Sequence, residues 1–164
     1  MRVLFFGTPL FSEIVLEKLI EKHEVVGVVC QPDKPANRGK KLVSPNIKHL
    51  AEERGIKVYQ FEKLKENLDV INNINPDIFV TASYGKILPK ALLDMKLCIN
   101  VHPSMLPKYR GATPIQTALL NGDKKTGVTI MKTDVGMDDG DIILQKEVEI
   151  LDEDDYNSLM PKLA

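Results

Sequence analysis

The opening stretch Arg2-Val3-Leu4-Phe5-Phe6-Gly7 decides the fold. Its apolar residues run without alternation, as in a strand that is covered on both faces, and Gly7 with the following Thr8-Pro9 ends the run. Apolar residues then recur at helical spacing from Leu10 to Ile20, and a second apolar run covers Val25 to Val29. Strand, helix and strand in this order predict a βαβ unit with parallel strands.

Short apolar runs and helical segments keep alternating along the chain. Further strands are predicted at 56–59, 77–81, 97–101, 127–131 and 142–150. Further helices are predicted at 46–54, 64–74, 89–95 and 113–120, and another begins near residue 154. We therefore expect an α/β fold, a Rossmann-like doubly wound, mostly parallel sheet with helices on both faces. The last two strands are joined by a Gly-rich loop and are candidates for an antiparallel pair.

The composition indicates one globular domain. The 164 residues are 43% hydrophobic and 27% charged, and no apolar run approaches the roughly 20 residues that span a bilayer. Because the chain also lacks a signal peptide, we expect a cytoplasmic location and no membrane partner. Cys30 and Cys98 lie in apolar runs and are interpreted as buried residues in a reducing compartment. The helix that begins near Asp154 stops early, so the domain is expected to be truncated.

The charged and metal-ligating residues argue against a metal site and restrict nucleic-acid binding to one segment. The chain has no Cys-x-x-Cys pair and only three scattered histidines, so no metal site is expected. The formal net charge is −1, which leaves nucleic-acid contact to a local patch. One such patch is the long, polar, helix-free loop Gln31 to Val43, which is of a length that usually carries function. Against a single carboxylate, Asp33, it holds four cations: Lys34, Arg38, Lys40 and Lys41.

The first strand-to-helix turn argues against the binding of a dinucleotide cofactor. The segment Gly7 to Ser12 lacks the second and third glycines of the Gly-x-Gly-x-x-Gly pattern, and Thr8 and Pro9 leave little room for a pyrophosphate. The turn is either a tight connection or a platform of backbone N–H groups for a smaller ligand.

Asn100 and His102 form the most informative polar pair. They lie two residues apart at the carboxyl end of a predicted strand, so their side chains share one face, and Pro103 ends the strand beside them. Ligands of open α/β sheets bind at this end of the strands. An asparagine inside an apolar strand also needs a hydrogen-bond partner, which makes a purely structural role for the pair the weaker interpretation.

Two loops add further candidates. Glycines flank the carboxylates of the segment Gly136 to Asp141, which is either a solvated hairpin turn or a sharp turn that presents Asp138; its spacing does not fit a calcium loop. The segment Tyr84-Gly85-Lys86-Ile87-Leu88 follows a predicted buried strand and offers an aromatic ring, aliphatic side chains and free backbone. It either packs on the core or receives a flat ligand such as a pterin.

At this point the sequence resembles a known family. The stretch from Asn100 to Gly111 is similar to the central motif of the 10-formyltetrahydrofolate-dependent formyltransferases, and Gly127-Val128-Thr129-Ile130 with Asp138-x-Gly140 resembles their second motif. The resemblance covers essentially the whole chain and implies that residues 1–164 form the catalytic domain. The full enzymes also carry a second, carboxyl-terminal domain that binds tRNA, and we expect the given sequence to lack it.

The resemblance also implies roles for individual residues. It gives the catalytic triad as Asn100, His102 and Asp138, and no metal. It implies that 10-formyltetrahydrofolate, the co-substrate, is bound by two segments: Ser104, Met105, Leu106 and Pro107, and Tyr84 to Leu88. Two positions depart from the pattern. Met105 stands where leucine is usual, and Lys132 stands where glutamine is expected.

Within the family, the sequence resembles most the members that formylate initiator methionyl-tRNA. The Gly7-Thr8-Pro9 turn and the basic segment carry this resemblance, which implies tRNA contacts by Arg38, Lys40 and Lys41. We also expect a monomer. Two alternatives stay open at the sequence level. One is a formyltransferase for a small amine, such as glycinamide ribonucleotide or an amino sugar nucleotide. The other is a non-catalytic Rossmann-like binding module.

Overall fold

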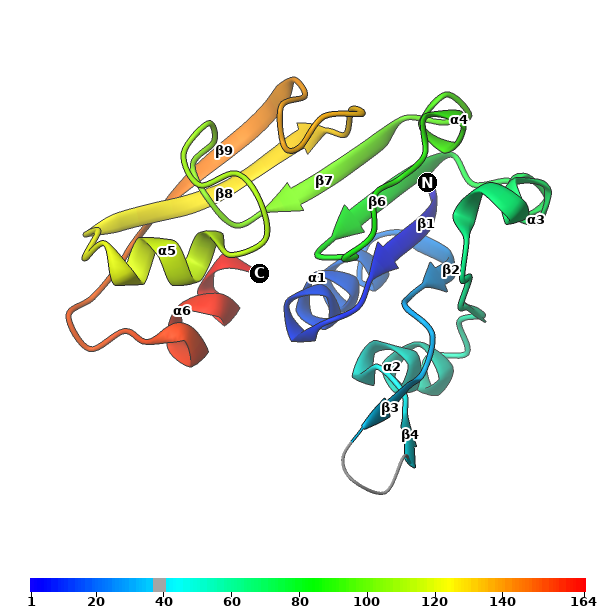
Figure 1. The fold of residues 1–164 in the computed structure, drawn as a ribbon, viewed down its shortest axis with the longest axis horizontal. Helices are drawn as coiled ribbons and strands as arrows, with labels where there is room; N and C mark the ends of the chain where they lie inside the picture. The colour runs from blue at the N-terminus through cyan, green and yellow to red at the C-terminus, as the bar shows by residue number, and fades with distance from the viewer. Residues whose placement is uncertain (37–40) are drawn as a thin grey trace.

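The computed structural model describes residues 1–36 and 41–164 and contains one central sheet (Figure 1). Seven strands lie in the order β5-β2-β1-β6-β7-β8-β9. Their bounds are Arg2–Gly7 (β1), Glu24–Val29 (β2), Val58–Tyr59 (β5), Ile78–Ala82 (β6), Cys98–His102 (β7), Lys125–Lys132 (β8) and Ile142–Glu149 (β9). Strands β5 to β7 in this order are parallel, whereas β8 is antiparallel to β7 and β9 to β8. The mostly parallel sheet and its antiparallel last pair are thus confirmed.

Helices cover both faces of the sheet. They are α1 (Leu10–Ile20), α2 (Asn46–Glu53), α3 (Leu68–Ile74), α4 (Lys90–Leu93), α5 (Pro114–Leu120) and α6 (Tyr156–Leu163), with a 3-10 turn, η1, at Leu64–Asn67. In the first strand, Val3 and Phe5 pack with α1, α2, α5 and α6, whereas Leu4 and Phe6 pack with η1, α3 and α4. Helices α5 and α6 lie side by side next to β8 and β9 (Figure 1). The predicted doubly wound fold is therefore confirmed.

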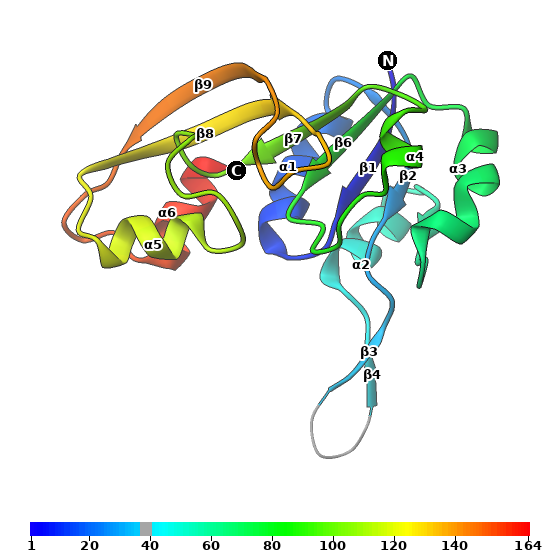
Figure 2. The same ribbon diagram turned by 45° about the horizontal axis from the view of Figure 1, so that its top comes forward.

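The segment Gln31 to Val43 contains a structure that its sequence did not indicate. Strands β3 (Lys34–Ala36) and β4 (Lys41–Val43) form an antiparallel hairpin that projects from the body of the protein (Figure 2). At its base, Asp33 accepts hydrogen bonds from Gln60 Nε2 at 2.6 Å and from Lys48 Nζ at 3.1 Å. These hydrogen bonds, the one from Gln60 foremost, lower the pKa of the Asp33 carboxyl. The base of the hairpin is therefore tied to the domain.

The strand order places the functional end of the sheet. Chain connections run from β1 outward to β2 on one side, and the chain then returns to β6 on the other side of β1. Loops at the carboxyl ends of β1 and β6 therefore diverge, which is where ligands bind in sheets of this kind. The hydroxyl of Thr8, after β1, donates to the carbonyl of Tyr84, after β6, at 3.1 Å. This hydrogen bond joins the two loops across the switch point.

Two leucines on helices provide a matched test of this packing. Leu16 of α1 is fully buried, whereas Leu120 at the end of α5 is 87% exposed. We expect Leu16→Ala to lower the free energy of unfolding by about 2–5 kcal/mol, because it removes buried methyl groups and leaves a cavity. Leu120→Ala should change it by no more than about 0.5 kcal/mol. Urea unfolding followed by circular dichroism measures both, and equal effects would contradict the assigned core.

Candidate active site

A cleft of about 650 Å³ opens at the carboxyl ends of β1, β6 and β7. Its lining includes Thr8 and Pro9 from the first turn, Tyr84 to Leu88 after β6, Asn100 and His102 of β7, and residues 111, 112 and 114–116 before and in α5. The loop between β8 and β9, residues 133–138, closes one side. The cleft thus collects the predicted triad and one of the two predicted folate-binding segments.

Asn100 is oriented by a neighbour that the sequence analysis did not single out. Thr81 lies opposite Asn100 in the pairing of β6 with β7, and its hydroxyl donates to Asn100 Oδ1 at 2.7 Å. This hydrogen bond turns the amide so that Nδ2 faces Asp138 Oδ1, at 3.4 Å. Because that second contact is long, the amide N–H remains available to a bound ligand. Thr81 could have been suspected, since it lies near the carboxyl end of the neighbouring strand.

His102 is almost completely enclosed, with 5% of its side chain exposed. Its Nε2 lies 2.9 Å from the backbone carbonyl of Tyr109. A carbonyl oxygen can only accept, so Nε2 carries the proton in this contact. On the other side of the ring, Nδ1 is 3.6 Å from Asp138 Oδ2, too far for a hydrogen bond. Nδ1 is therefore the ring nitrogen that can meet a ligand.

Asp138 completes the group from the far side of the cleft. Its Oδ2 accepts a hydrogen bond from the backbone N–H of Gly111 at 2.8 Å. Its backbone lies in the left-handed region, with φ of 49°, a conformation that aspartate tolerates better than most residues. The structure thus brings Asn100, His102 and Asp138 together, although β7 and the β8–β9 loop are distant in sequence.

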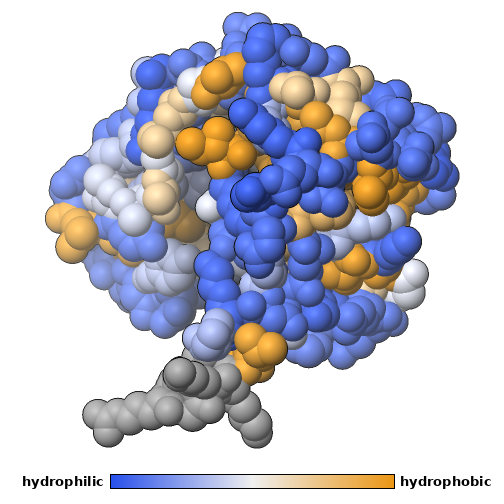
Figure 3. Space-filling model, turned by 45° about the vertical axis from the view of Figure 1, so that its right-hand side comes forward, coloured by the Kyte–Doolittle hydropathy of each residue, from blue (hydrophilic) through white to orange (hydrophobic). Residues whose placement is uncertain are grey.

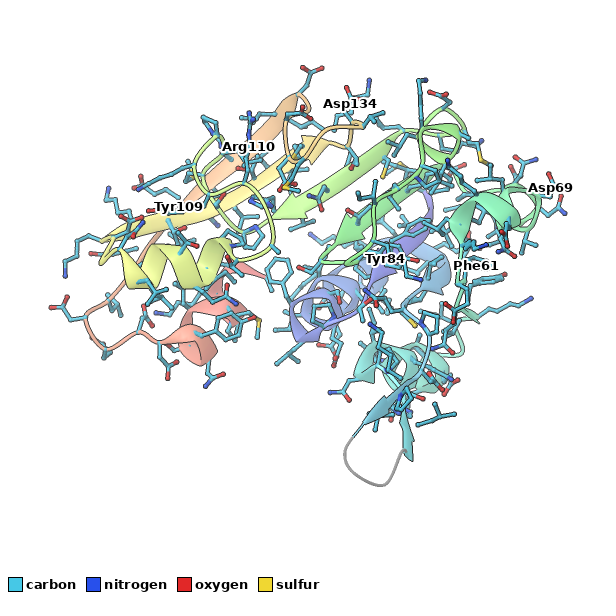
Figure 4. The ribbon with its side chains drawn as sticks, viewed as in Figure 1. Phe61, Asp69, Tyr84, Tyr109, Arg110 and Asp134 are labelled. Carbon is cyan, nitrogen blue, oxygen red and sulfur yellow. The ribbon has the colours of Figure 1, made fainter. Side chains whose placement is uncertain are left out.

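The loop after β7 supplies backbone groups to the site, and a side-chain network holds it. Tyr109, which has φ of 59°, donates its hydroxyl proton to Asp123 at 2.6 Å and accepts from Asn121 at 2.9 Å. Lys108 pairs with the same carboxylate, and these contacts, the Tyr109 hydrogen bond foremost, lower the pKa of Asp123. Figure 4 shows Tyr109 and Arg110 on this loop and Asp134 on the loop after β8. No sequence pattern identifies a backbone carbonyl as the partner of His102.

The segment Ser104 to Pro107 connects the end of β7 to the rest of the loop before α5. Among the described residues that line the cleft, none belongs to this segment. Ser104 is fully buried, and its hydroxyl donates to the carbonyl of Lys108 at 2.6 Å. Leu106 donates its N–H to Thr129 and accepts at its carbonyl from Gln145. The segment holds the β7–α5 loop against β8 and β9 through these hydrogen bonds. Its direct contact with folate stays a prediction.

The second predicted segment lines the cleft along its whole length, from Tyr84 to Leu88. Tyr84 is buried against the edge of Phe6, and Figure 4 shows it beside β6. Burial raises the pKa of its phenol to about 12, so the hydroxyl stays protonated. The Lys86 ammonium donates to the carbonyls of Phe61 and Glu62, and Ile87 is 84% exposed. This segment offers apolar surface rather than charge.

Three remaining expectations concern cysteines, metal and the basic segment. Cys30 and Cys98 are buried free thiols, and burial raises the pKa of each to about 11. Within the described ranges there is no cluster of three or more metal-ligating side chains, and no helix is long and apolar enough to cross a membrane. Arg38 and Lys40 lie outside the described residues, and for Lys41 only the strand is described. Their predicted contacts with tRNA stay predictions.

Comparisons with known proteins agree with the interpretation of the site. A family model described as formyl transferase matches residues 1–164. The methionyl-tRNA formyltransferase of Acetivibrio thermocellus is 50% identical over 169 residues, covering 100% of this chain and 54% of that protein. The enzyme of the same name from Dictyoglomus thermophilum is 49% identical with the same coverage. The chain spans about half the length of these curated relatives.

Solved structures support the fold. Phosphoribosylglycinamide formyltransferase from Bacillus halodurans superposes with a TM-score of 0.78 at 26% identity, over 99% of this chain and 87% of that one. Its namesake from Anaplasma phagocytophilum gives 0.80 at 22% identity, over 99% and 79%. Fold and site define a Rossmann-like α/β protein with an amide, an imidazole and a carboxylate at its switch point. The chain belongs to the formyl transferase family.

The orientation of Asn100 by Thr81 generates a prediction for catalysis at this site. Thr81→Val removes the donor, frees the amide to turn, and should lower kcat about five- to tenfold. Thr81→Ser keeps the hydroxyl and should restore most of the rate. Steady-state kinetics with thermal unfolding as a control measure both variants. A Ser variant as impaired as the Val variant would show that the methyl group, not the hydrogen bond, is important.

Proposed function

We propose that this protein transfers the formyl group of 10-formyltetrahydrofolate to the amino group of initiator methionyl-tRNA. The observation that carries the proposal is the convergence of Asn100, His102 and Asp138 in the switch-point cleft. About 50% identity to proteins named methionyl-tRNA formyltransferase supports the choice of acceptor. A protein of this kind acts in translation initiation in the cytoplasm, as a monomer that binds folate and tRNA.

The cleft suits the folate co-substrate in size and in surface. Its volume of about 650 Å³ lies within the range of small-molecule sites. Ile87, Val135 and Met137 line it and are 84%, 57% and 70% exposed, respectively. Exposed aliphatic groups on both sides of a cleft suit a flat heteroaromatic ring, and the loop backbone can serve its polar edge. In this proposal, the segment Ser104 to Pro107 holds the β7–α5 loop in place beside the cleft.

The triad can perform the transfer without a covalent enzyme intermediate. The amine of the acceptor forms a C–N bond to the formyl carbon, and the bond from that carbon to N10 then breaks. Negative charge grows on the formyl oxygen between these steps, and Asn100 Nδ2 can donate a hydrogen bond to it. His102 Nδ1 can donate a second one from the imidazolium form, which carries a proton on both ring nitrogens and is favoured by the Asp138 carboxylate. Asp138, or a water that it holds, accepts the proton that leaves the amine, and N10 gains a proton as it departs.

The β3–β4 hairpin suits a nucleic-acid acceptor. Small amines do not require an arm that projects from the domain, whereas a tRNA acceptor stem offers phosphates and base edges to Arg38, Lys40 and Lys41. This observation favours the tRNA over a small amine, although the solved relatives named phosphoribosylglycinamide formyltransferase share the fold.

The triad is tested by Asn100→Ala and Asp138→Asn in the full-length protein. We expect each to lower kcat by roughly 10²- to 10³-fold, since each removes a group that meets developing charge or the migrating proton. Asparagine keeps the shape of Asp138 and tolerates its left-handed backbone. Folate binding, measured by calorimetry, should change little. Asp139→Asn, an exposed neighbour outside the cleft lining, is the control. Loss of folate binding alone would favour the non-catalytic binding module, and transfer that survives both substitutions would show that the triad does not carry the reaction.

The hairpin is tested by Arg38→Ala and Lys41→Ala with initiator methionyl-tRNA as acceptor. Each substitution should raise KM and reduce the slope of log affinity against log salt by about one, the loss of one phosphate contact. Lys90→Ala, an exposed cation of α4 that pairs with Asp94, should change neither. If glycinamide ribonucleotide were formylated instead of the tRNA, the fold and triad would stand and the acceptor would be wrong.

A further inference from the structure

Gln31 makes hydrogen bonds to three separate parts of the structure around the cleft. Its backbone N–H donates to the hydroxyl of Thr8 at 3.3 Å, and its backbone carbonyl accepts from Gln60 Nε2 at 3.0 Å. Its side-chain Oε1 accepts from Lys34 Nζ at 2.7 Å, and its Nε2 donates to the backbone carbonyl of Tyr84 at 3.2 Å. Gln31 therefore connects the first turn and the β3–β4 hairpin to the segment Tyr84 to Leu88.

The chemistry of its partners fixes the orientation of the Gln31 amide. An ammonium group can only donate and a backbone carbonyl can only accept, so Oε1 must face Lys34 and Nε2 must face Tyr84. The Tyr84 carbonyl also accepts from the Thr8 hydroxyl at 3.1 Å. Both lone pairs of this carbonyl are thus used, which fixes the peptide group between Tyr84 and Gly85.

The backbone on either side of Tyr84 has an unusual conformation. Ser83 has φ of 49° and Gly85 has φ of 79°, both in the left-handed region. Residues other than glycine seldom adopt this region, and they keep it where the surrounding structure holds them. A Cβ atom at Gly85 would lie 2.5 Å from Gln31 Nε2, so the glycine also lets the amide approach. The hydrogen bonds from Gln31 and Thr8 therefore stabilise the start of the segment.

Apolar packing gives the middle of the segment and the hairpin little support. Ile87 is 84% exposed, and the Lys86 ammonium donates to the carbonyls of Phe61 and Glu62. Around the hairpin the surface is mainly hydrophilic, with an apolar patch next to the grey atoms (Figure 3). Polar contacts, those of Gln31 among them, therefore hold both parts to the domain.

We propose that Gln31 is a positioning residue for the folate co-substrate. Its amide holds the Tyr84–Gly85 peptide group in the conformation that shapes one wall of the cleft, without touching the reacting atoms. This inference rests on the proposed function and deepens it, because it names the residue that preorganises the proposed folate-binding segment. Loss of the amide should therefore weaken folate binding and leave the chemical step nearly unchanged.

The test uses Gln31→Met and Gln31→Glu in the full-length protein. Both substitutions keep the length of the side chain and remove the donor to Tyr84, and glutamate also keeps an acceptor for Lys34. Each should raise the Kd of 10-formyltetrahydrofolate, measured by calorimetry, and its KM by about fivefold, the size of one hydrogen bond. The value of kcat should change by less than about twofold, since the triad is intact. Thermal unfolding checks that each variant is folded at the assay temperature.

Lys34→Met is the matched control for the other end of the amide. It leaves the donor to Tyr84 in place, and water can replace the ammonium group at this exposed contact. The Kd of 10-formyltetrahydrofolate should therefore change by less than about twofold.

Thr8→Val separates positioning from a direct contact with folate. Each single variant leaves the Tyr84 carbonyl one donor, whereas Thr8→Val with Gln31→Met leaves it none. The Kd of the double variant should therefore rise by more than the product of the two single effects. A rise equal to the product would indicate that Gln31 acts independently of this carbonyl, and the positioning role would be wrong. If Gln31→Met binds 10-formyltetrahydrofolate as tightly as the wild type, the role is also wrong and the proposed function stands. If the wild-type protein does not bind it, the proposed function itself falls.

Discussion

Burial of β1 on both faces is the constraint on which the rest of the structure depends. Val3 and Phe5 on one face and Leu4 and Phe6 on the other leave this strand no side that tolerates water. It must therefore lie inside the sheet with a helical layer on each face. The chain leaves β1 toward β2 and later returns to β6, so its carboxyl end faces diverging loops. The position of the cleft is therefore set by β1, an apolar strand that itself carries no catalytic residue.

The site divides its tasks between side chains that face the cleft and groups that hold them. Thr81 fixes the amide of Asn100, and the Tyr109 carbonyl fixes the ring of His102. Tyr109 is itself held through Asp123 and Asn121, outside the cleft. Each ligand-facing atom thus has a defined direction before a ligand arrives. Such preorganisation is what electrostatic stabilisation of a developing charge requires, since no group must turn as the charge forms.

Sequence patterns predicted the parts of this molecule that depend on periodicity. The strands, the two-faced cover and the shared face of Asn100 and His102 follow from spacing, whereas the placement of Asp138 beside them came from family resemblance. The β3–β4 hairpin gave too weak a signal, because three-residue strands that include Pro35 show no alternation. The Tyr109 carbonyl could not be predicted at all, since backbone groups leave no trace in residue identity.

The left-handed backbone of Asp138 restricts how this position can evolve. Glutamate would keep the carboxylate but lengthen the side chain and lose the local hydrogen bonding that makes a positive φ acceptable. Glycine would suit the backbone and lose the side chain, and asparagine would keep the shape without the charge. No single replacement provides both the carboxylate and a backbone that accepts a positive φ, so substitutions at this residue are not neutral. In relatives that have lost the reaction, we expect Asp138 to be among the first site residues replaced, by residues that suit a positive φ better.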